Sequence, residues 1–131
     1  MKYFTIKELS HSDTALIRGI DNHPTTEAVS NLTRLVNNVL DPLREKYGKP
    51  VYVSSGYRSP ALNKSVNGAT SSQHRLGEAA DITAGSKEEN RKLFEIIKRE
   101  LPFDQLIDEK DFSWVHVSYR EGRNRKQTLK L

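Results

Sequence analysis

The chain has 131 residues with 21 Lys or Arg, 17 Asp or Glu, four His, no Cys and a formal net charge of +4. This length fits one domain, because two domains would each lie near the lower size limit for an independent core. The lack of cysteine excludes disulfides, thiolate nucleophiles and Cys-containing zinc sites, so a catalytic metal would need His and carboxylate ligands. Aliphatic runs such as Ala15-Leu16-Ile17 are about three residues long, against about 20 for a membrane span and about 7–15 for a signal-peptide core. We therefore expect no membrane span and no signal peptide.

The N-terminal third is predicted to be helical. Thr5 and Glu8 have the spacing of a capping box, which predicts a short helix ending at Ser10. Ser12 is a good N-cap for a second short helix, and Gly19 is a typical residue to end it.

A longer amphipathic helix is predicted next, starting at Thr25 or Thr26 and ending at Gly48. Its apolar residues recur every three or four positions, as expected for one buried face. They are Val29, Leu32, Val36, Val39, Leu43 and Tyr47. Pro42 lies within this run and should kink it, because the proline ring displaces the carbonyl one turn earlier.

The middle of the chain predicts two strands with a short helix between them. Residues 51–55 are rich in β-branched and aromatic residues, and residues 79–83 read as a buried strand. Between them, Ser59-Pro60 is a good N-cap and first-turn pair for a helix ending near Asn67-Gly68.

A second capping box, Ser86-Lys87-Glu88-Glu89, predicts a helix that ends just before Pro102, followed by strands over residues 103–108 and 113–119. This order of elements predicts an α+β fold, with helices around a small, mostly antiparallel sheet. We expect a single domain over residues 1–131.

An aspartate in a buried strand of small residues needs an explanation. Period-two alternation puts Asp81 on one face of its strand and Ala80 on the other. A carboxylate among such neighbours is costly to desolvate unless a positive group meets it. His74 lies seven residues earlier, and Gly77 allows a turn that brings the two together. As an alternative, Asp81 is simply a turn or cap residue.

His116 offers a second imidazole. Alternation in the last predicted strand puts His116 on the face opposite Val115 and Val117. If this strand neighbours that of Asp81, then His74, Asp81 and His116 converge as a three-ligand zinc set with a fourth position open to water. Iron and manganese also accept these ligands, and a lone histidine in a strand is most often an ordinary polar residue. We interpret the other histidines, His11 and His23, as surface residues.

Three motifs in order carry a family resemblance. They are Ser55-Gly56-Tyr57-Arg58-Ser59-Pro60, Ser72-x-His74-x-x-Gly77-x-Ala79-x-Asp81 and Trp114-Val115-His116-Val117-Ser118. The chain, from about Phe4 to Leu131, resembles zinc D-alanyl-D-alanine carboxypeptidases and related peptidoglycan endopeptidases. The clan also contains lysostaphin-type enzymes and the hedgehog signalling domain.

The resemblance implies one zinc ion per chain, bound by His74, Asp81 and His116. It also implies that Arg58 contacts the substrate, through a substrate carboxylate or the oxyanion as it forms. The implied reaction is hydrolysis of a peptide bond in peptidoglycan stem peptides, either of the D-Ala-D-Ala carboxypeptidase type or of the L-Ala-D-Glu endopeptidase type. The sequence leaves the choice between them open.

The general base is less clear from the resemblance, since relatives often place Glu or Asp three residues before the second zinc histidine, where this chain has Ser113. Of the nearby carboxylates, Asp108, Glu109 and Asp111, we favour Glu109 because the end of its strand can hold it over the site.

Three further residues are candidates for substrate binding. Ser72 and Gln73 could hydrogen-bond the substrate backbone, and Trp114 could wall the cleft. Ordinary packing or loop stabilisation is the alternative for each of them.

The net charge lies at the C-terminus. Residues 120–131 hold five basic residues and one acid, whereas the first 119 residues are neutral. We interpret this segment as a solvated end, with contact to an anionic polymer such as the bacterial wall as the alternative. Nucleic-acid binding is the weakest hypothesis, because no recognition helix or stacking motif accompanies the charge.

Ser113 also favours an alternative function, that of a zinc-containing cell-wall-binding or structural module without hydrolytic activity. We expect a monomer that is made in the cytoplasm and acts on the wall after release, as phage or prophage lysins do.

Overall fold

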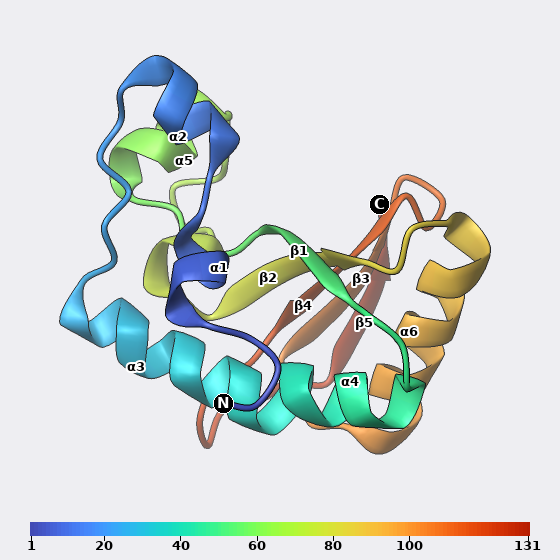
Figure 1. The fold of residues 1–131 in the computed structure, drawn as a ribbon. Helices are drawn as coiled ribbons and strands as arrows, with labels where there is room; N and C mark the ends of the chain where they lie inside the picture. The colour runs from blue at the N-terminus through green and yellow to red at the C-terminus, as the bar shows by residue number, and fades with distance from the viewer.

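The computed structural model describes residues 1–131, and a five-stranded sheet with strand order β1-β2-β4-β3-β5 forms its centre. The strands are β1 (Tyr52–Ser55), β2 (Ala79–Thr83), β3 (Gln105–Glu109), β4 (Trp114–Ser118) and β5 (Gln127–Lys130). Neighbouring strands are antiparallel, except that β3 and β5 are parallel. Helices flank the sheet (Figure 1), which confirms the predicted α+β fold.

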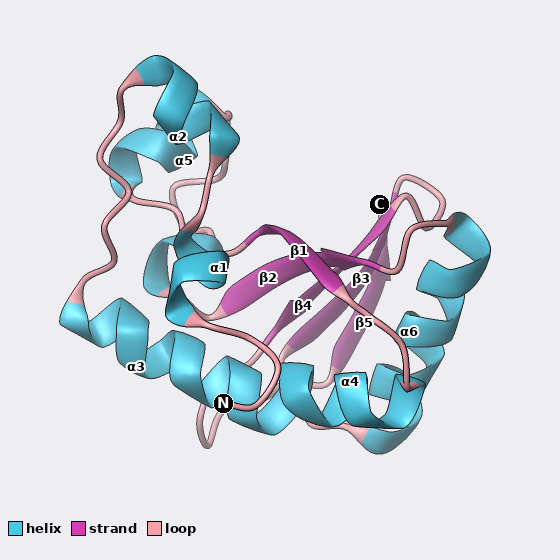
Figure 2. Cartoon of the chain, in the orientation of Figure 1, coloured by secondary structure: helices cyan, strands magenta, loops and turns pink.

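All of the helical elements come before β3 in the chain (Figure 2). They are α1 (Ile6–Ser10), α2 (Asp13–Arg18), α3 (Thr26–Leu35), a π-helical turn η1 (Val36–Leu40), α4 (Asp41–Tyr47), α5 (Pro60–Ser65), a 3-10 turn η2 (Gln73–Leu76) and α6 (Lys87–Glu100). The α-helices at the predicted start signals begin as expected, because a Ser or Thr side chain accepts a hydrogen bond from a backbone N–H three residues later. These caps are Thr5, Ser12, Thr25, Ser59 and Ser86. None of the helices is both long enough and apolar enough to cross a membrane.

The interruption predicted at Pro42 takes the form of the π-helical turn η1. At the end of this turn the N–H of Asp41 donates to the carbonyl of Val36, five residues earlier. Pro42 then lies in the first turn of α4, where its missing N–H costs little. The extra residue in the turn lets the apolar face continue into the core despite the proline.

One face of the sheet forms the hydrophobic core together with α3, α4 and α6. Strand β2 contributes Ala80 and Ile82, β4 contributes Val115 and Val117, and β3 contributes Leu106. This is the period-two alternation predicted from the sequence. The intervening residues of the same strands point to the other face, where the polar candidate residues lie.

The helices α2 and α5 lie side by side at one end of the molecule (Figure 1), where Arg18 donates to the carbonyl of Ser65 at 3.0 Å. Arg58 lies in the loop between β1 and α5, and its side chain contacts Asp81 on β2.

Residues 120–131, which the sequence predicted to be a solvated end, are mostly exposed, but they are not a free tail. Residues 127–130 form β5, which pairs with β3, and the backbone N–H of Gln127 and of Leu131 donate to the carbonyls of Asp104 and Asp108 at 2.9 and 2.8 Å. The pairing satisfies the outer edge of β3, which would otherwise expose unpaired backbone groups. The segment is therefore attached to the sheet, and the side chains of Arg120, Arg125 and Lys130 contact buried carboxylates.

Candidate metal centre and cleft

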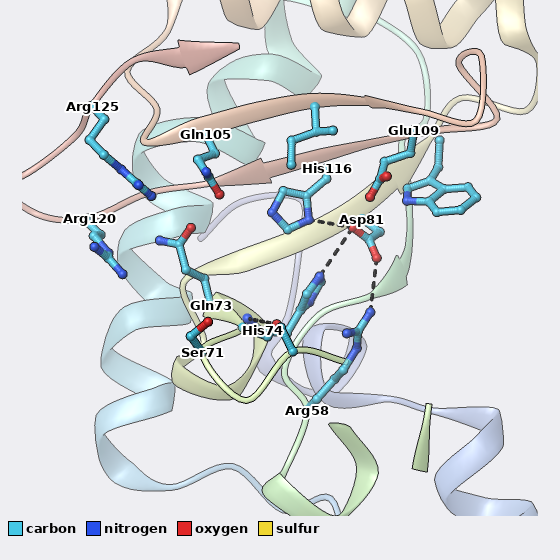
Figure 3. Close-up of a pocket in the computed structure, with 14 residues that line it drawn as sticks. Arg58, Ser71, Gln73, His74, Asp81, Gln105, Glu109, His116, Arg120 and Arg125 are labelled. Atoms are coloured by element: carbon cyan, nitrogen blue, oxygen red, sulfur yellow. Dashed lines mark hydrogen bonds and ion pairs between the residues drawn. The ribbon is translucent and has the colours of Figure 1, made fainter. Parts of the chain in front are cut away.

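Three side chains converge on the open face of the sheet. One ligand atom from each of His74, Asp81 and His116 lies within 4.8 Å of the other two. Nδ1 of His116 and Nε2 of His74 lie 3.0 and 3.4 Å from the same oxygen, Oδ1 of Asp81. Figure 3 shows the three side chains pointing toward one another. The structure thus brings together the three residues that the sequence singled out.

The sheet register places two of the three residues. Asp81 on β2 lies directly opposite His116 on β4, so both side chains leave the same face of the sheet at neighbouring positions. His74 comes from η2, where Ser72 Oγ accepts a hydrogen bond from the His74 N–H at 3.2 Å. Gly77 then turns the chain into β2 with a φ of +76°, and a Cβ there would lie 2.5 Å from the carbonyl oxygen of Ala28. Only glycine fits this turn.

The hydrogen bonds of His74 fit a metal site. Nδ1 of His74 lies 2.7 Å from the carbonyl oxygen of Gly56. A carbonyl oxygen only accepts, so Nδ1 carries the hydrogen and Nε2 presents a lone pair to Asp81 Oδ1. Two lone-pair atoms that face each other need a cation between them, either a second proton or a metal ion. A backbone partner on the far ring nitrogen is the usual support of a metal-binding histidine.

Asp81 is held in its ionised form. Burial raises the pKa of this carboxyl, but the contacts with the His116 and His74 imidazoles outweigh burial and hold the pKa below its usual range. The second oxygen, Oδ2, lies 3.4 Å from Nη2 of Arg58. Two imidazoles and one ionised carboxylate are a donor set that zinc accepts.

Arg58 is fixed by three contacts, one from each guanidinium nitrogen. Besides the Nη2 contact to Asp81, its Nε donates to Ser55 Oγ at 3.0 Å and its Nη1 donates to Asn63 Oδ1 at 3.4 Å. Its backbone N–H donates to the carbonyl of His74 at 3.0 Å. The loop that carries Arg58 is therefore tied to two of the three converging residues.

Glu109 ends β3 and lines the same cleft, whereas Ser113 does not. The hydroxyl of Ser113 donates instead to the carbonyl of Lys110 at 2.7 Å, within the turn between β3 and β4. Three consecutive residues of this turn have positive φ, which is unusual for side chains other than glycine. They are Lys110, Asp111 and Phe112.

Two buried polar side chains fasten that turn. Asp108 Oδ1 accepts a hydrogen bond from the Phe112 N–H at 2.6 Å, and Asn90 Nδ2 donates to the carbonyl of Phe112 at 2.9 Å. The turn therefore holds its uncommon backbone conformation by contacts to the body of the protein, which fixes the strand end that bears Glu109.

The converging residues lie in a cleft of about 540 Å³, a size typical of ligand sites. All of the sequence-predicted candidates line this cleft: Arg58, Ser72, Gln73, His74, Asp81, Glu109, Trp114 and His116. Six further residues line it that were not predicted to be site residues: Ala69, Ser71, Gln105, Ile107, Arg120 and Arg125.

Comparison with known proteins identifies the family of the chain. A family model described as Peptidase M15 matches residues 2–118. The chain belongs to the peptidase M15 family. The family resemblance that the sequence motifs predicted is therefore confirmed.

One curated relative of this M15 family member is the zinc D-Ala-D-Ala carboxypeptidase of Streptomyces albus G, which is 35% identical over 85 residues. The matched region covers 64% of this chain and 32% of the relative, so the chain matches about a third of that protein's length.

The match to the M15 family model ends at the last residue of β4, before the two arginines of the cleft. Arg125 binds Asp104, which is fully buried, and Arg120 contacts Glu78. A signal for this cluster was present in the sequence. Asp104 stands in an apolar predicted strand, as Asp81 does, and so needs a positive partner.

Proposed function

We propose that this protein hydrolyses peptide bonds in the stem peptides of peptidoglycan with the help of one zinc ion. The observation that carries the proposal is the convergence of His74 Nε2, Asp81 Oδ1 and His116 Nδ1 on the open face of the sheet, within a cleft, in a chain of the peptidase M15 family. The name of the Streptomyces relative, a zinc D-Ala-D-Ala carboxypeptidase, supports both the metal and the class of substrate.

His74, Asp81 and His116 would hold the zinc ion. A zinc ion bound by three protein ligands acidifies a water molecule and polarises a carbonyl, which is the chemistry that peptide hydrolysis needs. Arg58 keeps Asp81 oriented through the contact of Nη2 with Oδ2, and Gly56 keeps His74 in the tautomer with a free Nε2.

Glu109 serves as the general base in this proposal. Its carboxylate accepts a proton from the attacking water and then delivers it to the nitrogen of the leaving amine. The position of Glu109 at the end of β3, in the wall of the cleft, supports this role. The positive charge of Arg58, which lines the same cleft, stabilises the negative charge that develops on the carbonyl oxygen.

Two other residues of the cleft, Gln73 and Trp114, bind the peptide in this proposal. Gln73 Oε1 is buried without a hydrogen-bond partner, and so is Trp114 Nε1. An unpaired buried acceptor and an unpaired buried donor fit the N–H and C=O of a peptide backbone. Ser72 already accepts the His74 N–H, so its main contribution is to hold the turn that presents His74.

The proposal is tested by combining elemental analysis of the purified protein with digestion of purified cell walls and mass analysis of the products. We expect about one zinc ion per chain, and products that arise from cleavage of a stem-peptide bond. A chelator should abolish cleavage, and added zinc should restore it. The masses of the products distinguish a carboxypeptidase, which releases D-Ala, from an endopeptidase, which cuts within the stem. Zinc-loaded protein that cleaves no stem peptide would contradict the proposal.

The alternative, a zinc-containing cell-wall-binding module without activity, was suggested by Ser113 in the place where relatives often have an acid. Ser113 points into its own turn, while Glu109 supplies a carboxylate to the cleft. This arrangement favours the hydrolytic function. Retention of the zinc-loaded protein on purified walls without release of peptide would favour the alternative.

A further inference from the structure

The cleft continues beyond the three converging residues into a basic wall formed by Arg120 and Arg125. Figure 3 shows these two arginines on one side of His116 and Asp81, with Glu109 on the other side. Both come from the C-terminal segment, which β5 holds against β3. The proposed function assigns no role to this wall.

Asp104 anchors Arg125. The side chain of Asp104 is fully buried, and it accepts hydrogen bonds from Nε and Nη2 of Arg125 at 2.9 and 2.8 Å. The hydrogen bonds from Arg125 lower the pKa of Asp104 to about 2, so this carboxylate is ionised at neutral pH. The paired contact uses one edge of the guanidinium, while Nη1 of Arg125 makes no hydrogen bond within the chain.

Arg120 is anchored in the same manner. Its Nε lies 3.3 Å from Oε1 of Glu78 and 3.8 Å from Oδ2 of Asp104. The backbone N–H of Arg120 donates to Asn124 Oδ1 at 2.8 Å, which fixes the turn after β4. Neither terminal nitrogen of Arg120 makes a hydrogen bond within the chain, so both remain available in the cleft.

Gln73 connects this wall to the three converging residues. Its Nε2 donates to Asp104 Oδ2 at 3.0 Å, and its unpartnered Oε1 is buried in the wall of the cleft. Gln73 also directly precedes His74 in η2. A free acceptor therefore lies between the converging imidazoles and a pair of arginines with free donors. A peptide N–H followed by a carboxylate has the matching order of groups.

Arg58 is a poorer candidate for binding a carboxylate. Each of its three nitrogens already donates to a group of the protein, and its side chain is only 17% exposed. The side chains of Arg120 and Arg125 are 30% and 50% exposed. Guanidinium groups with unused nitrogens bind carboxylates through charge-assisted hydrogen bonds.

The two bonds considered for this protein share one chemical feature. In a D-Ala-D-Ala terminus, the residue after the cleaved bond carries a free α-carboxylate. In an L-Ala-D-Glu bond of a stem peptide, the D-Glu continues the chain through its side-chain carboxyl, so its α-carboxylate is free as well. In both substrates a D-residue with a free α-carboxylate leaves as the amine.

We propose that Arg120 and Arg125, held by Glu78 and Asp104, form the subsite for this α-carboxylate and so select the residue on the leaving side of the cleaved bond. The proposal rests on the proposed function for the class of substrate. It differs from a purely structural role, in which the arginines only fasten β5 and the turn after β4.

The test compares peptides with and without the charge. One pair is diacetyl-L-Lys-D-Ala-D-Ala with a C-terminal carboxylate or amide, and the other is L-Ala-γ-D-Glu-L-Lys with a free or amidated α-carboxyl on D-Glu. Dissociation constants are measured by calorimetry on zinc-loaded Glu109→Gln protein, and cleavage is measured with the native chain. We expect one pair to show a preference of about ten- to hundredfold for the peptide with the free carboxylate. That pair identifies which of the two substrates supplies the carboxylate.

Arg120→Gln and Arg125→Gln should each reduce this preference to less than about threefold and leave binding of the amide form unchanged. The matched control is Arg123→Gln, which removes an equal charge from an exposed position outside the cleft and should keep the preference. Thermal unfolding of each variant checks that the fold is intact.

Two outcomes would overturn the subsite. In the first, the parent protein binds neither the free-carboxylate nor the amide peptide, or binds both with equal affinity. In the second, both Arg→Gln variants bind the two peptides more weakly by the same factor. A preference in binding without any cleavage by the native chain would refute the proposed function and leave the subsite standing. Cleavage by the native chain without a preference in binding would support the proposed function and refute the subsite.

Discussion

Glu109 lies directly opposite Trp114 in the antiparallel register of β3 and β4. Alternation along β3 sends Gln105, Ile107 and Glu109 to the cleft, while Leu106 points into the core. The strand thus brings a carboxylate to the cleft from a position seven residues before His116. Glu109 therefore supplies a carboxylate to the cleft although the position three residues before His116 is a serine. That residue, Ser113, lies in the turn that joins the two strands.

Replacing Glu109 by Gln should abolish most hydrolysis without loss of zinc. The amide has nearly the same shape but cannot accept the proton of the attacking water, and loss of a general base costs typically about 10²–10⁴-fold in rate. The measurements are kcat on stem peptides and zinc content by elemental analysis. Asp111→Asn is the control, because Asp111 is an exposed acid of the adjoining turn and asparagine tolerates its positive φ. Full activity of Glu109→Gln would remove this residue from the mechanism.

Arg58→Lys should weaken zinc binding or lower kcat by about 10–100-fold. Lysine keeps the positive charge, but one ammonium group cannot reach Asp81, Ser55 and Asn63 at the same time. Zinc affinity is measured by competition with a chelator of known affinity, and kcat is measured with excess zinc. Arg18→Lys, at an exposed position on α2, should behave as the native chain does. Unchanged affinity and unchanged kcat would show that charge alone suffices at position 58.

Asn90→Ala should destabilise the fold by about 2–3 kcal/mol and lower kcat while the zinc content stays the same. Asn90 is buried and bridges two segments, because its Oδ1 accepts the Ala84 N–H at 2.6 Å and its Nδ2 donates to the turn after β3. Removal leaves buried backbone groups without partners. Urea unfolding and steady-state kinetics measure the two effects. Asn37→Ala, at an exposed helical position, should change stability by less than about 0.5 kcal/mol. A stable Asn90→Ala protein with normal kcat would contradict the role given to the turn.

Asp104→Asn should cost about 2 kcal/mol of stability at pH 7 and progressively less in acid. The pKa of Asp104 in the folded chain is about 2, because Arg125 hydrogen-bonds its carboxylate, whereas an unfolded aspartate has a pKa of about 3.9. The ionised form therefore stabilises the fold fully above about pH 5, and this contribution is lost as the pH falls toward 2. Urea unfolding of both proteins between pH 7 and pH 2.5 measures the difference. If the difference in stability between the two proteins stays constant or increases in acid, the ion pair of Asp104 with Arg125 does not stabilise the fold as described.

Local signals in the sequence were sufficient for most of the fold. Caps such as Ser59 and Ser86 act within one helical turn, so their effect does not depend on the rest of the protein. Alternation in β2 and β4 correctly predicted the faces of Asp81 and His116, because the core face is marked by neighbouring aliphatic residues. For the same reason Asp81 and His116 could be chosen before the structure was known, whereas His74, which lies in a turn, was chosen from its spacing to Asp81 and from the family motif.

The features that the sequence did not predict depend on long-range contacts. Strand β5 has a single half-buried apolar residue, Leu129, and its pairing partner β3 lies about 20 residues earlier in the chain. The exposed pattern of residues 120–131 looks like a solvated end for that reason. The pairing of Arg125 with Asp104 follows only once β5 is placed beside β3. The π-helical turn at Val36–Leu40 likewise depends on how the helix packs around Pro42.

The central claim is that His74, Asp81 and His116 share one zinc ion, and anomalous diffraction tests it most directly. Crystals grown with zinc would be measured on both sides of the zinc absorption edge. We expect one strong anomalous peak per chain, about 2.0–2.2 Å from His74 Nε2, Asp81 Oδ1 and His116 Nδ1. A zinc peak at any other residues, or no peak in crystals of zinc-saturated protein, would contradict it.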